Sequence, residues 1–280
     1  MKPLWLNKKI NLKDCSEMKH ALRALGLNSV CEQAMCPNIG ECFSSGTATF
    51  LILGKNCTRH CSFCNIRKEA PYPLDESEPE RVFEAVRRLL LKHVVITSVT
   101  RDDVADGGAG IFAKTVELIR RNLPEVTVEV LIPDFKFSAD SLRAVIVSSP
   151  RIIAHNLETV PSLYPAVRQG ADYRGSLGLL QAVKSADPLI KTKSGLMLGL
   201  GEEKEEVISV MRDLREAGCD FLSIGQYLAP SRLHYPVKRY ASPAEFEEYR
   251  DKALELGFAH TESGPYVRSS YKARDYLQNV

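Results

Sequence analysis

Six of the eight cysteines in this chain of 280 residues form two consecutive triplets, and each triplet is one ligand short of four. The first triplet is Cys31, Cys36 and Cys42, and the second is Cys57, Cys61 and Cys64. A four-iron cluster has four corners, so three thiolates leave one iron open to another ligand. Two such triplets in one short stretch predict two iron–sulfur clusters, each with an iron available for chemistry.

The bulk composition is that of an ordinary globular protein, with 44% hydrophobic and 26% charged residues, which allows a sizeable core. The net charge of +2 does not call for a nucleic-acid partner. Residues 1–70 carry ten Lys and Arg against five Asp and Glu, which could receive an acidic partner or simply form a solvated basic face.

Nothing in the sequence predicts a membrane span or a secretory signal. No apolar run reaches the length of about 18 residues that a span needs. The first residues lack the apolar core and cleavage site of a signal peptide. We therefore expect a cytoplasmic protein in a reducing compartment, where clustered cysteines are more often metal or redox ligands than disulfides.

The middle of the chain alternates predicted strands and helices. The strands are expected at 47–53, 93–99, 127–133, 151–159, 195–200 and 220–228. The helices between them are expected at 79–92, 110–123, 138–149, 175–186 and 202–218. The strands are apolar throughout, as in a parallel sheet covered on both faces. A complete eight-stranded barrel takes about 250 residues, so the repeat at 47–228 predicts an α/β fold with a partial (β/α)6 barrel. Residues 1–46 and 229–280 are then extensions, the latter with a helix at 242–257.

The second triplet, in the run CTRHCSFC, follows the first of these strands directly. Loops at this place build the active sites of barrel enzymes. The spacing C-x3-C-x2-C resembles the signature of the radical S-adenosylmethionine enzymes, with Phe63 at its aromatic position. The resemblance implies a 4Fe–4S cluster on these thiolates, whose open iron binds S-adenosylmethionine for cleavage to a hydrogen-abstracting radical. A zinc site that includes His60, or a set of buried thiols, is the alternative.

Later segments resemble the same enzymes and supply predicted cofactor contacts. GLGEE at 199–203 is similar to their glycine-rich segment, where the backbone approaches the cofactor closely. Asn156 and Glu158 are two apart on a predicted strand and so share a face, which suits ribose hydroxyls or, alternatively, a loop contact. Arg174 and Lys193 could meet the cofactor carboxylate or be packing charges. The predicted contacts are Phe63, Asn156, Glu158, Arg174, Lys193, Gly199, Gly201 and Glu202.

The first triplet narrows the resemblance. Its spacing C-x4-C-x5-C is similar to the auxiliary-cluster motif of the lipoyl synthases, and nearly the whole chain resembles that family. The other matching segments are 97–109, 155–168, 192–203, 225–240 and the RSSY run at 268–271. In that family three cysteines and a serine of RSSY hold the auxiliary 4Fe–4S cluster. The match implies Ser270 as the ligand, with Ser269 as the alternative and a turn or cap as the ordinary role.

This resemblance implies a sulfurtransferase reaction. Two sulfur atoms enter at C6 and C8 of an octanoyl chain on a lysine, and the auxiliary cluster is their source. A hard serine oxygen binds iron less well than a soft thiolate, which suits a cluster that must open. The implied partners are lipoyl carrier domains, namely 2-oxoacid dehydrogenase E2 and the glycine cleavage H protein, and an electron donor such as flavodoxin or ferredoxin. Arg59, Arg67 and Lys68 would favour encounter with an acidic carrier.

Two alternatives remain open from the residues. One is another radical enzyme with an extra cluster, such as a methylthiotransferase or a biotin-synthase-like enzyme. The other is an electron carrier, which would more typically use four cysteines per cluster, or a zinc-stabilised binding protein. Cys15 and Cys219 are expected to be bystanders. The group Arg101, Asp102 and Asp103 follows the second strand and could orient substrate or bridge loops.

Overall fold

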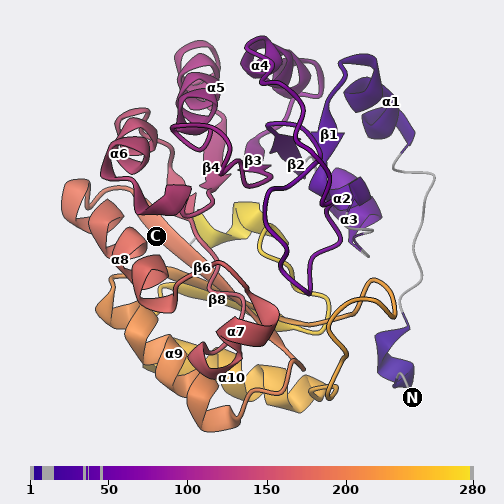
Figure 1. Ribbon diagram of the computed structural model, residues 1–280, viewed down its shortest axis with the longest axis vertical. Coiled ribbons are helices and arrows are strands. Elements are labelled where there is room, and N and C mark those ends of the chain that lie inside the picture. Colours follow the sequence, from indigo (N-terminus) through magenta and orange to yellow (C-terminus); the bar gives the residue numbers. More distant parts are fainter. Residues whose placement is uncertain (1–2, 8–15, 34–35, 37, 45–46, 278–280) are drawn as a thin grey trace.

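A single eight-stranded sheet forms the centre of the computed structural model, which describes residues 3–7, 16–33, 36, 38–44 and 47–277 (Figure 1). The strands follow one another in chain order. β1 is antiparallel to β2, and every other neighbouring pair is parallel. The strands are β1 (Asn28–Ser29), β2 (Thr47–Ile52), β3 (His93–Ser98), β4 (Thr127–Leu131), β5 (Ile152–Ala154), β6 (Lys191–Leu198), β7 (Phe221–Gln226) and β8 (His260–Gly264).

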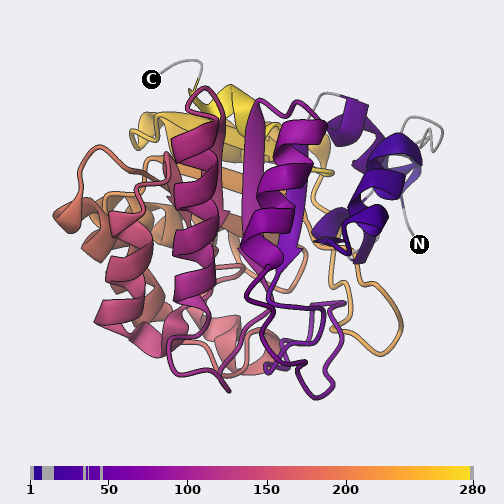
Figure 2. The ribbon, with the colours of Figure 1, turned by 90° about the horizontal axis from the view of Figure 1, so that it is seen from above.

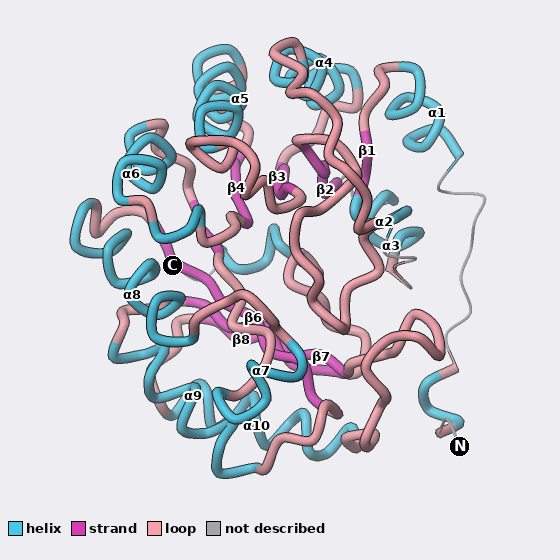
Figure 3. The backbone as a smooth tube through the Cα atoms, viewed as in Figure 1, coloured by secondary structure: helices cyan, strands magenta, loops and turns pink. Residues whose placement is uncertain are grey.

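Helices cover the outside of the curved sheet, as the tube in Figure 3 shows. The α-helices are α1 (Ser16–Ala24), α2 (Val30–Gln33), α3 (Ile39–Ser44), α4 (Glu78–Arg88), α5 (Ala109–Asn122), α6 (Ala139–Val147), α7 (Tyr164–Val167), α8 (Tyr173–Ala186), α9 (Lys204–Glu216) and α10 (Pro243–Glu255). The short 3-10 helices are η1 (Leu4–Leu6), η3 (Phe135–Phe137), η4 (Pro161–Leu163) and η5 (Ala273–Leu277). Residues that favour helix starts lie at the expected places in α4 and α6. Pro79 lies in the first turn of α4, and the Ser138 hydroxyl accepts the Ser141 N–H at the start of α6.

The predicted fold class is confirmed. Each of the six predicted strands is present, and all six are parallel. Every residue of β2 and of β7 is buried, as expected for strands with helices on one side and a filled barrel interior on the other. The core has two large parts, one around β2 to β5 and the other around β6, β7 and helices α8 to α10.

Two strands lie outside the predicted repeat. β1 lies in the predicted N-terminal extension, and β8 lies in the predicted C-terminal extension, where it pairs in parallel with β7. β8 has the sequence HTESG, which carries neither an apolar run nor an alternation of apolar residues. β8 belongs to the sheet because it pairs with β7. No local sequence pattern indicated this strand. The sheet thus crosses the boundaries of the division into 1–46, 47–228 and 229–280, which stays a prediction.

One predicted strand is much shorter than expected. The pattern at 151–159 predicted nine residues, but β5 ends at Ala154. Beyond it the backbone leaves the strand conformation, since Glu158 has a φ of +67°. Glu158 still forms an isolated parallel bridge with Leu196 of β6. Asn156 and Glu158 therefore lie beyond the end of the strand on which they were predicted, although their side chains do bond each other at 3.1 Å.

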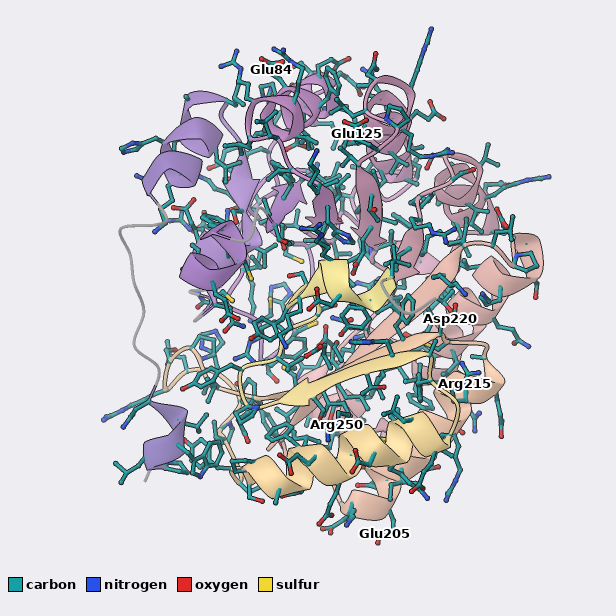
Figure 4. The ribbon with its side chains drawn as sticks, turned by 180° about the vertical axis from the view of Figure 1, so that it is seen from behind. Glu84, Glu125, Glu205, Arg215, Asp220 and Arg250 are labelled. Carbon is teal, nitrogen blue, oxygen red and sulfur yellow. The ribbon has the colours of Figure 1, made fainter. Side chains whose placement is uncertain are left out.

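The barrel is open, because β1 and β8 are the two edges of the sheet and pair with no further strand in the described part of the chain. The last described residues lie in this opening. Seen from behind, the yellow C-terminal stretch lies between the helices at the start of the chain and β8 (Figure 4). Seen from above, η5 and the loop after β2 lie at opposite ends of the molecule (Figure 2). No helix among the described residues is long and apolar enough to cross a membrane.

Candidate active site

The second cysteine triplet lies in the loop after β2, at the end of the barrel where the parallel strands finish. The loop is tied to itself, since the Cys57 N–H donates to the Arg67 carbonyl at 2.8 Å. It is also tied to the barrel rim, since the Ser62 N–H donates to the Val167 carbonyl at the end of α7 at 3.1 Å. These bonds hold Cys57, Cys61 and Cys64 over the mouth, as predicted from the strand that precedes them.

The three thiols of this loop are free and close to one another. Burial raises the pKa of Cys64 to about 12, and the nearby charges of Cys61 and Cys57 add to the rise. The Cys57 sulfur accepts N–H groups from Arg59 at 3.4 Å and Thr100 at 3.3 Å, the kind of bond that tunes iron–sulfur clusters.

The donor set fits a 4Fe–4S cluster, because iron would replace the protons that burial keeps on these thiols. In the described part of the chain, no three His, Cys, Asp or Glu side chains converge as on a single metal ion, be it zinc or iron. The fit therefore rests on the thiols and their N–H partners, and not on a preformed coordination geometry.

Asn156 and Glu158 lie beside this loop. The Asn156 amide donates to the Glu158 carboxylate at 3.1 Å. Burial raises the pKa of Glu158, and the guanidinium of Arg168 opposes the rise. The charge of Glu158 in turn acts on Cys61 and Cys64. The structure thus brings this predicted pair and the second triplet into one group.

Arg168 is a site residue that the sequence analysis did not single out. It is 9% exposed, and its guanidinium donates to the Tyr164 hydroxyl at 2.8 Å and contacts His155 at 3.2 Å. Its charge lowers the pKa of the Cys61 thiol, although burial raises that pKa more. Only its place at the end of a short helix brings it here, so cysteine spacing and strand periodicity could not have indicated it.

The glycine-rich segment follows β6 with two left-handed glycines. Gly199 has a φ of +97° and Gly201 a φ of +117°, which L side chains rarely adopt. The Glu202 carboxylate accepts the N–H groups of Gly199, Leu200 and Gly201 at 2.7, 2.8 and 3.1 Å. Glu202 was predicted to contact the cofactor. Its carboxylate faces back into its own loop, so it shapes the segment, and a direct contact stays a prediction.

Phe63 packs against an apolar cluster at the mouth that contains Val167, Leu200 and Tyr227. The aromatic residue between the last two cysteines therefore ties the cysteine loop to the glycine-rich segment. Arg174 is exposed at the start of α8, with its guanidinium 5.9 Å from the centroid of the Tyr173 ring. Among the described residues, the ring of Tyr173 is the neighbour of Arg174, and its predicted contact with the cofactor stays a prediction.

Lys193 is not brought to the mouth. It lies near the start of β6, fully buried, with its ammonium 3.0 Å from the Glu129 carboxylate. The glycine-rich segment follows the other end of the same strand. The structure therefore gives no support to the predicted contact between Lys193 and a cofactor carboxylate, because the ammonium is already paired inside the barrel.

The first triplet lies at the edge of the sheet next to β1 and β2. Cys31 is buried, and burial raises its pKa to about 11, with the charge of Cys36 adding to the rise. Cys42 lies further along the chain, in α3, and lines a hollow together with Thr47 and Tyr271. Three thiols in this region form a donor set that again fits a cluster that needs one more ligand.

The RSSY run meets this first triplet, although more than two hundred residues separate them. The Tyr271 hydroxyl donates to the Glu41 carboxylate at 2.7 Å. Arg268 is half-buried, and the charge of Cys36 acts on it. The Ser269 hydroxyl donates to the Asn156 amide oxygen at 3.1 Å, so this serine points toward the second triplet.

The other charged residues of the mouth pair with one another. Arg59 bonds Asp102 at 2.8 Å and also pairs with Asp134. Arg101 bonds Asp103 at 2.8 Å and the Leu53 carbonyl at 3.2 Å. Of the two roles left open for this group, the structure supports loop bridging. Arg59 is therefore not a free cation on the surface, in contrast to the exposed Arg67 and Lys68.

Cys219, expected to be a bystander, is buried and lies two residues before β7, where its thiol contacts the Phe221 carbonyl at 3.3 Å. Burial raises its pKa to about 12, as expected for a free cysteine that acts as a small apolar side chain. Cys15 lies outside the described residues.

Known proteins resemble this chain along nearly its full length. The Radical SAM superfamily matches residues 51–214. The lipoyl synthase of Geobacter sp. (strain M21) is 58% identical over 277 residues, which cover 99% of this chain and 95% of the relative. The lipoyl synthase of Caldanaerobacter subterraneus subsp. tengcongensis is 55% identical over 272 residues, covering 97% and 95%.

Solved structures share the fold at low sequence identity. Streptococcus suis SuiB bound to the precursor peptide SuiA has a TM-score of 0.61 and 11% identity, with 94% of this chain and 57% of that chain covered. Methylornithine synthase has a TM-score of 0.57 and 16% identity, with 90% and 74% covered. At such identities the likeness concerns the fold alone.

Proposed function

The chain belongs to the lipoyl synthases, which are radical S-adenosylmethionine enzymes, and we propose that it inserts two sulfur atoms at C6 and C8 of a protein-bound octanoyl-lysine. The product is the lipoyl cofactor, and an auxiliary 4Fe–4S cluster is the sulfur source. One observation carries this proposal. The RSSY run lies against the first triplet, with Tyr271 bonded to Glu41 and Arg268 beside Cys36.

The second triplet would hold the cluster that binds S-adenosylmethionine. When bound, that pair supplies a radical able to remove hydrogen from an unactivated carbon. Residues of this chain would position the cofactor. Asn156 and Glu158 present an amide and a carboxylate next to the cysteine loop, which suits ribose hydroxyls. In the segment after β6, Gly201 leaves room for close backbone approach, whereas the space beside Gly199 is filled by Gln226 and Arg239.

The first triplet would hold the auxiliary cluster, with Ser270 as its fourth ligand. The Ser269 hydroxyl is engaged by Asn156 at 3.1 Å. Within the described part of the chain, only the backbone carbonyl of Ser270 forms a hydrogen bond, which it accepts from the Ala273 N–H at 3.3 Å. This difference favours Ser270 over Ser269. An oxygen ligand binds iron less strongly than a thiolate, so it suits a cluster that must release its sulfur.

The decisive experiment is anaerobic turnover with an octanoylated carrier domain and S-adenosylmethionine, followed by mass spectrometry of the carrier. The wild type should add two sulfurs and lose two hydrogens, and it should hold about eight irons per chain. Ser270→Ala should yield roughly tenfold less of this product, while Ser269→Ala keeps the iron of both clusters. Repeated turnover of Ser270→Ala at the full rate would rule out the serine ligand. A colourless protein with bound zinc would rule out the radical chemistry.

We further propose that the partners are acidic lipoyl carrier domains and a small electron donor such as flavodoxin or ferredoxin, in a reducing cytoplasm. Arg67 and Lys68 are exposed on the cysteine loop and would draw such a carrier toward the mouth. Arg59 is not included among these docking cations, since it is paired with two carboxylates. Charge reversal of Arg67 and Lys68 should slow turnover on a carrier domain more than on an octanoyl-lysyl peptide. Equal loss on both substrates would contradict this docking.

A further inference from the structure

The C-terminal segment, residues 265–277, ends in η5, which lies at the opposite end of the barrel from the cysteine loop (Figure 2). This helix carries the buried Tyr276. Tyr276 forms a small apolar cluster with Ile152 and Phe221. Its ring centroid lies 5.4 Å from that of Phe221 and 4.7 Å from that of His260. This part of the C-terminal segment therefore packs inside the barrel.

A buried ion pair lies against the face of this tyrosine. The Lys193 ammonium is 3.8 Å from the centroid of the Tyr276 ring and 3.0 Å from the Glu129 carboxylate. Lys193 and Glu129 are both 0% exposed. His93 adds its ring nitrogen at 3.4 Å from the second carboxylate oxygen. Neither charge has a role in the chemistry at the barrel mouth.

Such a pair needs an explanation other than stability. Two buried charges lose their hydration, and a well-packed apolar pair of similar volume is often at least as stable. Buried ionic groups can instead select one arrangement among several. Here the ammonium selects an aromatic ring, because a cation over a ring face in a dry site is strongly attracted to it. The pair therefore recognises the chain end.

Backbone hydrogen bonds connect this tyrosine with the serine of the RSSY run. The Ala273 N–H donates to the Ser270 carbonyl at 3.3 Å, and the Asp275 N–H donates to the Lys272 carbonyl at 2.8 Å. The Lys272 ammonium lies 3.7 Å from the Glu262 carboxylate of β8. The seven residues from Ser270 to Tyr276 thus form consecutive turns that connect the tyrosine with the serine.

We propose that Lys193, Glu129 and Tyr276 form an anchor that positions Ser270 against the first cysteine triplet. These are positioning residues, since none touches the cysteines. The inference rests on the proposed auxiliary cluster at the first triplet. It adds residues at the far end of the barrel to those that position the ligands of this cluster. It also gives Lys193 a role, in place of the predicted contact with a cofactor.

The test compares Tyr276→Leu with the matched control Tyr276→Phe. Phenylalanine keeps the ring under the ammonium and loses the hydroxyl. The hydroxyl contacts the backbone of Glu262 and the Leu222 carbonyl, the latter at 3.5 Å, the limit of a hydrogen bond. Leucine loses the ring face. Tyr276→Leu should show roughly tenfold faster amide hydrogen exchange over residues 265–277. Its anaerobic iron content should fall from about eight toward about four per chain. Tyr276→Phe should resemble the wild type in both measurements.

A second variant keeps the proposal testable if Tyr276→Leu does not fold. Lys193→Met combined with Glu129→Gln removes both charges together, so neither remains buried alone. It should show the same faster exchange over 265–277 and the same selective iron loss, with S-adenosylmethionine still bound. Wild-type exchange and full iron in this double variant would overturn the anchor. A wild type with about four irons would instead contradict the proposed second cluster, and the exchange measurement would still decide on the anchor.

Discussion

At the scale of the residue, His155 shows how the site holds a cation beside its cysteines. The ring is buried, with Nδ1 at 2.9 Å from the Ile132 carbonyl oxygen and Nε2 at 3.2 Å from the Arg168 guanidinium. A carbonyl only accepts hydrogen bonds, so Nδ1 carries the proton and Nε2 accepts from Arg168. Burial, and then the charge of Arg168, lower the pKa of His155 to about 4. The neutral ring thus fixes the guanidinium that acts on Cys61 and Glu158.

This neutral histidine makes the stability of the protein depend on pH. An unfolded chain binds a proton at His155 below about pH 6.5, and the folded chain does so only near pH 4. The free energy of unfolding should therefore fall as the pH falls through this window, by about 2 kcal/mol at pH 5 from this residue alone. Urea unfolding of the wild type and of His155→Gln at pH 7.5 and pH 5 measures this change in the free energy of unfolding. The variant should lose less stability, and equal losses would contradict the assignment.

At the scale of the element, the turn after β6 depends on one carboxylate. Glu202 accepts three consecutive backbone N–H groups and pairs with Arg239 at 3.2 Å. The left-handed Gly199 and Gly201 need this support, since loops with few fixed contacts sample many conformations. The same turn faces the cysteine loop across Phe63, so its order bears on cofactor binding.

Removal of this carboxylate should affect both the fold and the cofactor. Glu202→Ala leaves buried N–H groups without an acceptor, and we expect a loss of about 2–3 kcal/mol in the free energy of unfolding. Binding of S-adenosylmethionine should weaken as well, because the glycine turn loses its order. Chemical unfolding and anaerobic calorimetry measure the two effects. Glu205→Ala, on the exposed first turn of α9, is the control, and identical cofactor affinities in both variants would refute the role of the turn.

At the scale of the whole molecule, the two ends of the chain complete the open barrel together. Asn38 donates to the Tyr266 carbonyl at 2.6 Å, and Tyr271 donates to Glu41 at 2.7 Å. A side chain at Gly225 would collide with the Val267 carbonyl, so the C-terminal segment lies directly on β7. The opening between β1 and β8 thereby becomes the place where the first triplet and the RSSY run meet.

The contact between the ends should be measurable as a coupling energy. A double-mutant cycle with Glu41→Met and Tyr271→Phe should give about 1 kcal/mol of coupling, the typical worth of such a hydrogen bond. Glu41→Met removes the acceptor at a similar side-chain length, and Tyr271→Phe removes the donor, so the coupling reports on the bond. Anaerobic unfolding of the four proteins measures it. Additive effects, with no coupling, would show that the two ends do not bond in solution.

Much of the fold and of the site could be predicted because the signals are local. Apolar runs and capping residues such as Ser138 depend on neighbours in the chain, so the six parallel strands and their helices were predictable. The two cysteine triplets are also local patterns, and the place of the second one followed from the strand before it. The role of Ser270 came from the resemblance of the RSSY run, and no spacing within the sequence links it to the first triplet.

The amino-acid sequence by itself thus determined the ligand types, their spacing and the barrel that carries the second triplet. Only the tertiary structure decided what pairs with what. Lys193 was predicted at the cofactor and lies against Tyr276, and Arg168 was overlooked and lies beside Cys61. β8 has no apolar run to reveal it. The reason is physical: charge pairs and edge strands depend on strand order and register between distant segments, and a local pattern carries no information about these.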